Sequence, residues 1–526
     1  MTSNQSTPTK TSDPVYDLVH SMSRMEKRYF NINTQSIKNN KGKTPDYYIL
    51  YEILDKMKIY DKEKAEQKLL KKLGKDGFSN FTVKKVELYD VLMKSLRNYT
   101  YKQTKKSADY IKVLIRDANF LFKRGLYKDA KKHLYEARKL AEKCGDTLSL
   151  IEINRFEREY LRINRSLEME ERLPVLHEEE GKLIEDLKIE AGLIRDYDLL
   201  VNQRMKNTSL VGKKNIEQFK SNYKHLHEID ANSISKIAQR FLWISLADYF
   251  FLLGENNKMV RVRQLSYEWW RDNELWKKQY PHYYILSLSN LLSTYSRLKD
   301  YQKFPEILMM IEKIESNNQH EETVRFHRLM IYHQIYYMNK GLLNEACNLS
   351  SRIRKGIKNY HLNEGVQIAL IFNTIVSFFI SDRYQECIEW INFFKPFEKI
   401  ERGKQQVQFA QIMKVISYFE LDKFEEIDDA VKSITNYFIN FFKMPDTDFE
   451  VKVLELLKEF YIAIPSRRKK ILEKIKNNIE IIQSSAETKR QIGMEELLLW
   501  VEYKLTNVSM ASLLITQNKK RSSKTN

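Results

Sequence analysis

The chain has 526 residues, with 89 Lys and Arg against 70 Asp and Glu, so its formal net charge is +19. Only 14 glycines and 9 prolines interrupt it, which favours long helices and leaves little room for strands. No apolar run reaches the roughly 18 residues of a membrane-spanning helix, so the sequence excludes a membrane role of that kind. The three cysteines, Cys144, Cys347 and Cys387, are far apart. An odd number of isolated cysteines predicts free thiols and a cytoplasmic location.

The N-terminal part predicts a short disordered segment followed by a helical cap. Residues 1–13 are polar and lack the apolar core of a secretory signal. Ser23 and Glu26 have capping-box spacing, so we expect a helix to begin there. Apolar residues at spacings of three and four predict further helices over 47–57, 62–73 and 81–99. These helices define a cap over residues 14–103.

From residue 104 to 513 one short phrase recurs: an aromatic or apolar residue, any two residues, then a small or apolar residue. The phrase is found at Tyr127–Ala130, Tyr301–Phe304, Leu343–Ala346, Tyr384–Cys387 and Phe424–Ile427. Its last positions, counted with Met259, are separated by 129 residues and then by 45, 42, 41 and 40. An apolar helical pattern precedes and follows each phrase. A period of this length predicts stacked helical hairpins that bury their apolar faces against one another.

The clearest unit covers 111–144 and resembles a tetratricopeptide repeat (TPR). Ala118, Gly125, Tyr127, Ala130 and Ala137 occupy its small, turn and corner positions. A step near 41 exceeds the 34 residues of that repeat by about one turn in each helix.

A different segment, Glu26–Phe30, lies about a hundred residues before this unit and extends the resemblance. Together they resemble a group of uncharacterised bacterial proteins with TPR-like helical repeats. The resemblance implies an all-α chain: a TPR-like α-solenoid of antiparallel helical hairpins, with a period of about 40, behind an N-terminal helical cap. It implies no reaction and no cofactor.

Catalytic and metal-binding motifs are absent from the sequence. There is no Gly-rich phosphate loop, no His-Glu-x-x-His and no Cys-x-x-Cys. His225 and His227, two residues apart, point away from each other on a helix and do not form a metal pair. We therefore expect a protein that is not an enzyme and that needs neither a metal nor a cofactor.

The repeat resemblance assigns a binding face. In such arrays the first helix of each hairpin lines the concave side. Carrying this over by position marks Lys112, Asn119, Lys123, Ile335, Met338, Val376, Phe379, Ile416 and Phe419. The later positions are apolar. They predict either a groove for a partner helix or peptide, or positions buried within the array. The first of these interpretations, a groove, predicts a noncovalent interaction scaffold whose partner is an unidentified protein or peptide.

A second function, binding of nucleic acid or regulation through basic surfaces, follows from the uneven charge. Between Lys84 and Lys106 there are seven basic and two acidic residues, a basic run starts at Arg467, and the predicted disordered tail, 514–526, is basic. Aromatic residues interleave with cations over 267–284, as stacking on unpaired bases requires. The candidate residues are Lys84, Lys85, Lys94, Arg97, Trp269, Trp270, Arg271, Arg467 and Arg468. Solvated helix faces and an aromatic joint between hairpins explain the same patterns, so we expect a protein partner in preference to nucleic acid.

Overall fold

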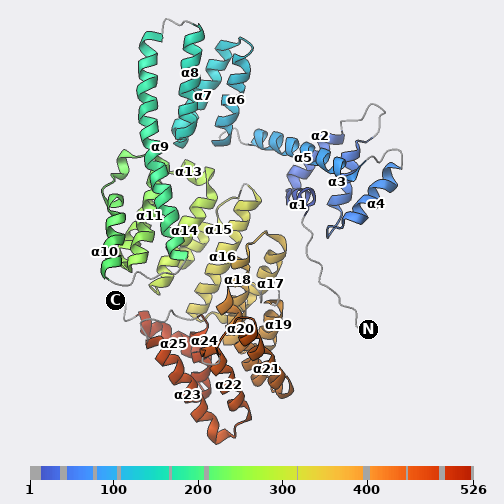
Figure 1. The fold of residues 1–526 in the computed structure, drawn as a ribbon, viewed down its shortest axis with the longest axis vertical. Helices are drawn as coiled ribbons and strands as arrows, with labels where there is room; N and C mark the ends of the chain where they lie inside the picture. The colour runs from blue at the N-terminus through green and yellow to red at the C-terminus, as the bar shows by residue number, and fades with distance from the viewer. Residues whose placement is uncertain are drawn as a thin grey trace. The chain divides into compact units, whose positions relative to one another are not determined.

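The computed structural model describes residues 13–35, 44–74, 80–103, 108–164, 169–205, 213–316, 318–394, 403–445, 448–484 and 492–522. In these ranges every regular element is helical (Figure 1). The prediction of an all-α chain is therefore confirmed. The chain divides into two compact units. The first contains Met1–Asp196 and Asp230–Phe241, and the second contains Tyr197–Ile229 and Leu242–Asn526.

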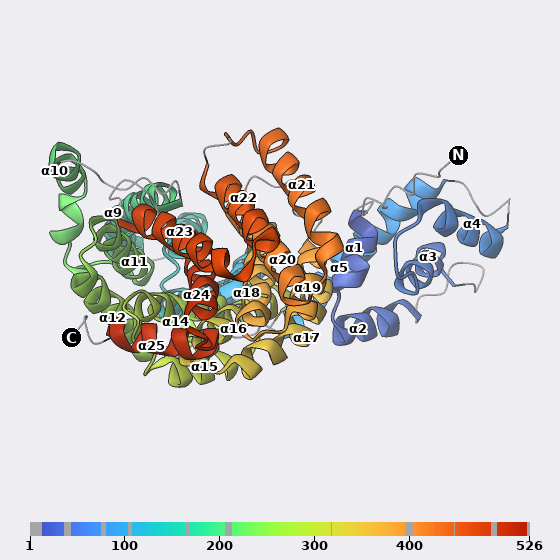
Figure 2. The same ribbon diagram turned by 90° about the horizontal axis from the view of Figure 1, so that it is seen from below.

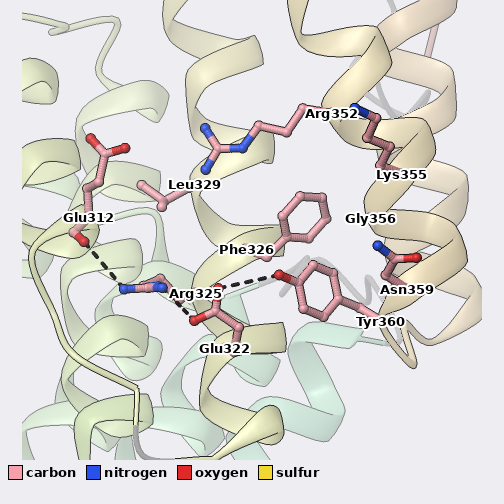
Figure 3. Close-up of a pocket in the computed structure, with 10 residues that line it drawn as sticks. All are labelled: Glu312, Glu322, Arg325, Phe326, Leu329, Arg352, Lys355, Gly356, Asn359 and Tyr360. Carbon is pink, nitrogen blue, oxygen red and sulfur yellow. Dashed lines mark hydrogen bonds and ion pairs between the residues drawn. The ribbon is translucent and has the colours of Figure 1, made fainter. Parts of the chain in front are cut away.

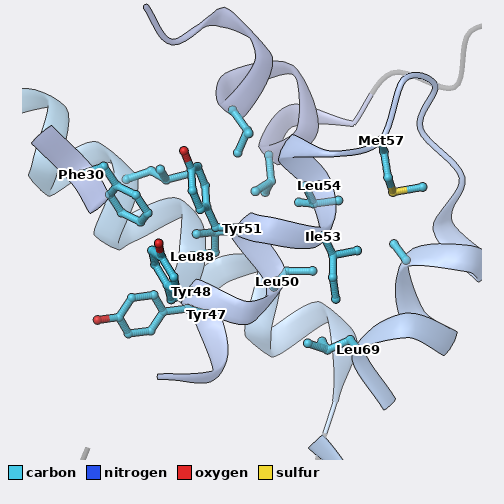
Figure 4. Packing of buried hydrophobic residues seen from close by; sticks show 14 of the residues in the cluster. Phe30, Tyr47, Tyr48, Leu50, Tyr51, Ile53, Leu54, Met57, Leu69 and Leu88 are labelled. Atoms are coloured by element: carbon cyan, nitrogen blue, oxygen red, sulfur yellow. The ribbon is translucent and has the colours of Figure 1, made fainter. Parts of the chain in front are cut away.

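Five helices at the start of the first unit share a core of their own. They are α1 (Pro14–Ser21), α2 (Arg24–Gln35), α3 (Asp46–Asp55), α4 (Lys62–Leu73) and α5 (Phe81–Gln103). α3 contributes more buried side chains to this core than any other of the five helices, and Figure 4 shows its Leu50 and Leu54 among residues of the neighbouring helices. The predicted capping box is confirmed, because the Ser23 amide donates to Glu26 at 2.7 Å and the Glu26 amide donates to the Ser23 hydroxyl at 3.3 Å. Of the predicted disordered segment 1–13, only Asp13 lies within the described residues.

Four further helices follow in the first unit: α6 (Ala108–Phe122), α7 (Tyr127–Cys144), α8 (Thr147–Asn164) and α9 (Met169–Met205), the last of which continues into the second unit. Ion pairs join α7, α8 and α9. The Arg138 guanidinium lies 2.8 Å from Glu157 and 3.1 Å from Glu179. The first unit thus holds these helices, up to Asp196 in α9, together with the five helices that share the N-terminal core.

The second unit contains the remaining α-helices. They are α10 (Lys213–Asn222), most of α11 (Lys236–Leu253), α12 (Asn256–Asp272), α13 (Glu274–Gln279), α14 (Pro281–Arg297), α15 (Phe304–Glu312), α16 (Gln319–Lys340), α17 (Leu343–Asn359), α18 (Glu364–Ile380), α19 (Tyr384–Phe394), α20 (Lys404–Glu420), α21 (Phe424–Asn440), α22 (Phe449–Ile462), α23 (Pro465–Ser484), α24 (Met494–Thr506) and α25 (Met510–Ser522). Consecutive helices from α14 to α22 contact each other. In addition α14, α16, α18, α20 and α22 form a row in which each helix contacts the next.

The same turn recurs between paired helices. In each of these turns one residue has a left-handed backbone conformation: Gly125, Gly254, Lys299, Gly341, Asp382 and Asp422. In each turn the following amide donates to the carbonyl five residues earlier, as from Leu342 to Tyr337 at 2.8 Å and from Arg383 to Phe378 at 3.0 Å. This pattern satisfies carbonyls at a helix end that would otherwise lack partners. From Gly254 onward the left-handed residues are 45, 42, 41 and 40 positions apart.

Four of the five phrases found in the sequence start helices, whereas α15 begins only at the last residue of the phrase Tyr301–Phe304. Tyr127, Leu343, Tyr384 and Phe424 are the first residues of α7, α17, α19 and α21. The last residue of every phrase is buried: Ala130, Met259, Phe304, Ala346, Cys387 and Ile427. Small or apolar side chains at this position allow the second helix of a hairpin to pack closely against its neighbours.

The C-terminal segment differs from its prediction. Residues 514–526 were expected to form a disordered basic tail, but the chain is helical in α25 up to Ser522. Leu513, Leu514 and Ile515 precede the basic residues and pack partly against other helices, which supplies burial that a solvated tail lacks.

Candidate functional site

Three of the predicted concave positions meet at one cavity. Ile335 and Met338 on α16 and Val376 on α18 line a space of about 230 Å³ that α24 and α25 close from the other side. The remaining lining residues are Lys299, Gln334, Asn339, Asn373, Ile380, Glu495, Glu496, Leu499, Leu514, Gln517 and Asn518. We call this space the α16–α18 groove. Its wall combines aliphatic side chains with carboxamides, and two carboxylates belong to the same lining.

Gln334 is the most deeply buried polar group of the groove, with 1% of its surface exposed. Its Nε2 atom donates to the Leu370 carbonyl at 3.2 Å and to the Thr374 hydroxyl at 2.9 Å. Its Oε1 atom has no hydrogen-bond partner. A buried acceptor without a donor is unfavourable, so this residue is an unsatisfied polar group in the wall of the groove.

The C-terminal helices reach the groove through specific contacts. Figure 2 shows α24 and α25 next to each other, and α25 contacts α16 while α24 contacts α18. The Asn518 side chain donates to the Asn339 carbonyl at 3.1 Å. Ile515 lies directly over the backbone of Gly341, where a Cβ atom would collide with it. The groove is thus occupied by a helix of the same chain.

The other predicted concave positions lie outside this groove. Phe379 and Ile416 are buried, and Phe419 packs on the ring of Phe460 with 5.0 Å between ring centroids. In the first unit Lys112 and Asn119 are exposed on α6, and Lys123 is exposed in the turn that follows it. Lys112 forms an ion pair with Glu152 at 2.8 Å.

The predicted basic and aromatic residues lie in both units. Lys94 and Arg97 are exposed on α5, whereas Lys84 pairs with Asp46 at 2.8 Å and Lys85 pairs with Asp13. Arg467 is exposed at the start of α23. The Arg468 guanidinium lies 5.6 Å from the Phe419 ring centroid, and its Nε atom donates to the Ala463 carbonyl at 3.1 Å.

Trp269 and Trp270 are buried at the C-terminal end of α12. Their rings are perpendicular with centroids 5.0 Å apart, and the Trp276 ring packs on Trp269 at 5.5 Å. Arg271 is exposed and lies 2.9 Å from Asp272. In this arrangement the two tryptophans fill a joint between helices, and neither presents an open ring face to a base.

A second cavity, of about 270 Å³, lies between α16 and α17 beside the end of α15 (Figure 3). Arg325 donates to Glu322 at 2.5 Å and to the Ile314 carbonyl at 2.6 Å. The Tyr360 hydroxyl donates to Glu322 at 3.3 Å. These bonds hold the acid and Arg325 on the wall of the cavity, while Arg352 and Lys355 are exposed at its edge. One sequence signal accompanies this cavity: a glycine, Gly356, inside a helical pattern.

The Phe326 ring leaves room only for a glycine at position 356, because a Cβ atom there would overlap the ring. We expect Gly356→Ala to lower the unfolding free energy by up to about 2 kcal/mol, since the overpacking cost exceeds the gain in helix propensity. Thermal melting followed by circular dichroism measures this. Gly181→Ala on α9 is the control: no atom lies within 4 Å of its Cβ position, and it should stabilise by about 0.5–1 kcal/mol. Equal shifts for both variants would contradict the packing of Phe326 on Gly356.

No metal site is formed in the part of the chain that the structure describes, where His, Cys, Asp and Glu never gather in groups of three or more. The three cysteines are buried free thiols. Burial raises the pKa of the Cys387 thiol to about 12, so it is protonated at neutral pH. Across the same described ranges, no helix combines the length and apolar character that crossing a membrane requires.

Comparison of the chain with protein-family models, with curated proteins and with solved structures found no match. The geometry of the groove is therefore the basis for assigning a function.

Proposed function

We propose that this protein is a TPR-like α-solenoid that acts as a noncovalent protein-interaction scaffold in the cytoplasm. It binds an amphipathic helix or peptide of a partner protein along the α16–α18 groove and needs no cofactor. The observation that carries the proposal is the presence of α25 in this groove, because a face that accommodates a helix of its own chain has the shape and chemistry for helix-in-groove recognition.

The repeated turns support the architecture in this proposal. Six turns share one left-handed position and one hydrogen-bond pattern, and the row from α14 to α22 places equivalent helices on one side. Stacked hairpins of this kind produce extended surfaces for binding. Ile335 on α16 and Val376 on α18 are 41 residues apart on neighbouring helices of that row, and Met338 lies one turn after Ile335, so apolar residues of two repeats line one groove.

The test is affinity capture from lysate on three tagged proteins: the parent, Met338→Glu and Met309→Glu. Met338 lines the groove, while Met309 is 53% exposed on α15. We expect Met338→Glu to reduce capture of a specific partner by about tenfold or more, the loss typical of a central contact, and Met309→Glu to retain it. Mass spectrometry with isotope labelling quantifies the difference.

Nuclease treatment and a salt series distinguish the protein scaffold from the alternative function, binding of nucleic acid. If all captured protein disappears with nuclease, and elution depends steeply on salt, the basic surfaces bind nucleic acid and the scaffold proposal is wrong. Equal capture by all three proteins after nuclease treatment would also reject the groove as the binding site.

A further inference from the structure

We propose that α25 is a resident, displaceable occupant of the α16–α18 groove, and that the partner is an amphipathic helix that takes its place. This inference rests on the proposed function and specifies both its partner and its regulation. The partner helix carries neighbouring aliphatic residues like Leu514 and Ile515, followed by a carboxamide like Asn518.

The two C-terminal helices differ in how firmly they are packed. On α24, Leu497, Leu499, Trp500 and Val501 are buried, and Trp500 donates to Glu420 on α20 at 2.7 Å. On α25, only Met510 and Asn518 are buried among the side chains that the structure describes, 510–518. α24 is thus integrated into the array, whereas α25 lies on its surface.

The seating of α25 is also incomplete. The groove keeps a cavity of about 230 Å³ beneath Leu514, and the Oε1 atom of Gln334 has no donor. Apolar wall that α25 leaves uncovered is surface whose burial favours binding. A helix that fills this space would therefore bind the groove better than α25 does.

The connection to α24 permits displacement. α24 ends at Thr506 and α25 begins at Met510. Between them Asn507 has a left-handed backbone and Val508 is exposed. Tethering gives α25 a high effective concentration at the groove, so it excludes weak ligands, and only a better-fitting helix replaces it. The contacts of α25 also define the ligand as a helix, because a helical register brings Ile515 over Gly341 and Asn518 to Asn339.

The test uses the full chain and a synthetic peptide of residues 508–526 as the probe. The double variant Leu514→Asp/Ile515→Asp releases the internal helix, and Thr516→Asp adds charge to an exposed position of the same helix. Fluorescence anisotropy should show saturable binding of the labelled peptide to the released variant, about tenfold or more tighter than to the parent or to Thr516→Asp. Adding Met338→Glu to the released variant should abolish this binding.

Peptide binding that is equal for all proteins, or absent from the released variant, would overturn the proposal. Hydrogen exchange gives an independent readout. In the parent, amides of 514–518 should exchange about tenfold or more faster than those of 498–504, since α25 opens locally. Equal protection of both helices would overturn displacement.

These outcomes are distinct from those of the capture experiment. If capture depends on Met338 but release of α25 does not increase it, the scaffold function stands and the resident-occupant proposal falls. If no captured protein depends on Met338, the scaffold function fails even where the peptide binds.

Discussion

Replacing Trp500 with alanine is expected to lower the unfolding free energy of the second unit by about 3–5 kcal/mol, the usual cost of removing a large buried aromatic side chain. Trp500 is fully buried and packs against Phe460 with ring centroids 5.7 Å apart. Its Nε1 atom donates to the Glu420 carboxylate at 2.7 Å. One side chain thus ties α24 to α20 and α22, and its loss leaves both a cavity and a carboxylate with fewer donors.

Urea unfolding followed by tryptophan fluorescence measures this effect selectively. All six tryptophans lie in the second unit, at 243, 269, 270, 276, 390 and 500, so the signal excludes the first unit. Trp500→Phe is the control, because it keeps most of the ring volume and removes the hydrogen bond to the carboxylate, a contribution of about 1.5–3 kcal/mol. If the alanine variant is no less stable than the phenylalanine variant, α24 does not pack against the array as described.

Asp248→Asn is expected to lower the unfolding free energy of the second unit by a similar amount, about 3–5 kcal/mol, because it leaves a buried cation without its counter-charge. One carboxylate oxygen of Asp248 lies 2.8 Å from Arg263 and 2.9 Å from Arg204. Asp248 and Arg263 are both buried. Burial lowers the pKa of the Arg263 guanidinium, and the Asp248 carboxylate opposes this effect by stabilising the charged form. The substitution keeps the shape of the side chain and removes only its charge.

Arg204→Gln provides the matched comparison for this pair. Arg204 reaches the same carboxylate, but its side chain is 36% exposed, so water compensates for most of its loss and the expected cost is below about 1 kcal/mol. Chemical denaturation of the two variants should therefore give clearly different midpoints. Similar midpoints would show that Arg263 is less dependent on Asp248 than the buried geometry indicates.

Local sequence signals predicted that the chain is helical and, at most of the recurring phrases, where the second helix of a hairpin begins. The capping box of Ser23 and Glu26 starts α2, and the phrases at Leu343 and Tyr384 start α17 and α19. These features depend on hydrogen bonds and apolar spacing within a few residues, which a sequence displays directly. Some turns were less visible because Asp382 and Asp422, rather than glycine, adopt the left-handed backbone.

The groove required long-range packing. Ile335, Met338 and Val376 were predicted from their register within the repeat, but neither the cavity nor its cover was foreseen. The contact from Asn518 to Asn339 joins positions 179 residues apart, and helical periodicity does not specify which helix covers which face. The same applies to α25, because its basic end resembles a solvated tail until Ile515 meets Gly341. The unpaired acceptor of Gln334 likewise arises from the surrounding helices, since its burial depends on Leu370 and Thr374 of α18. Helix formation is encoded by neighbours in the chain, whereas the α16–α18 groove is formed by residues that are adjacent only after folding.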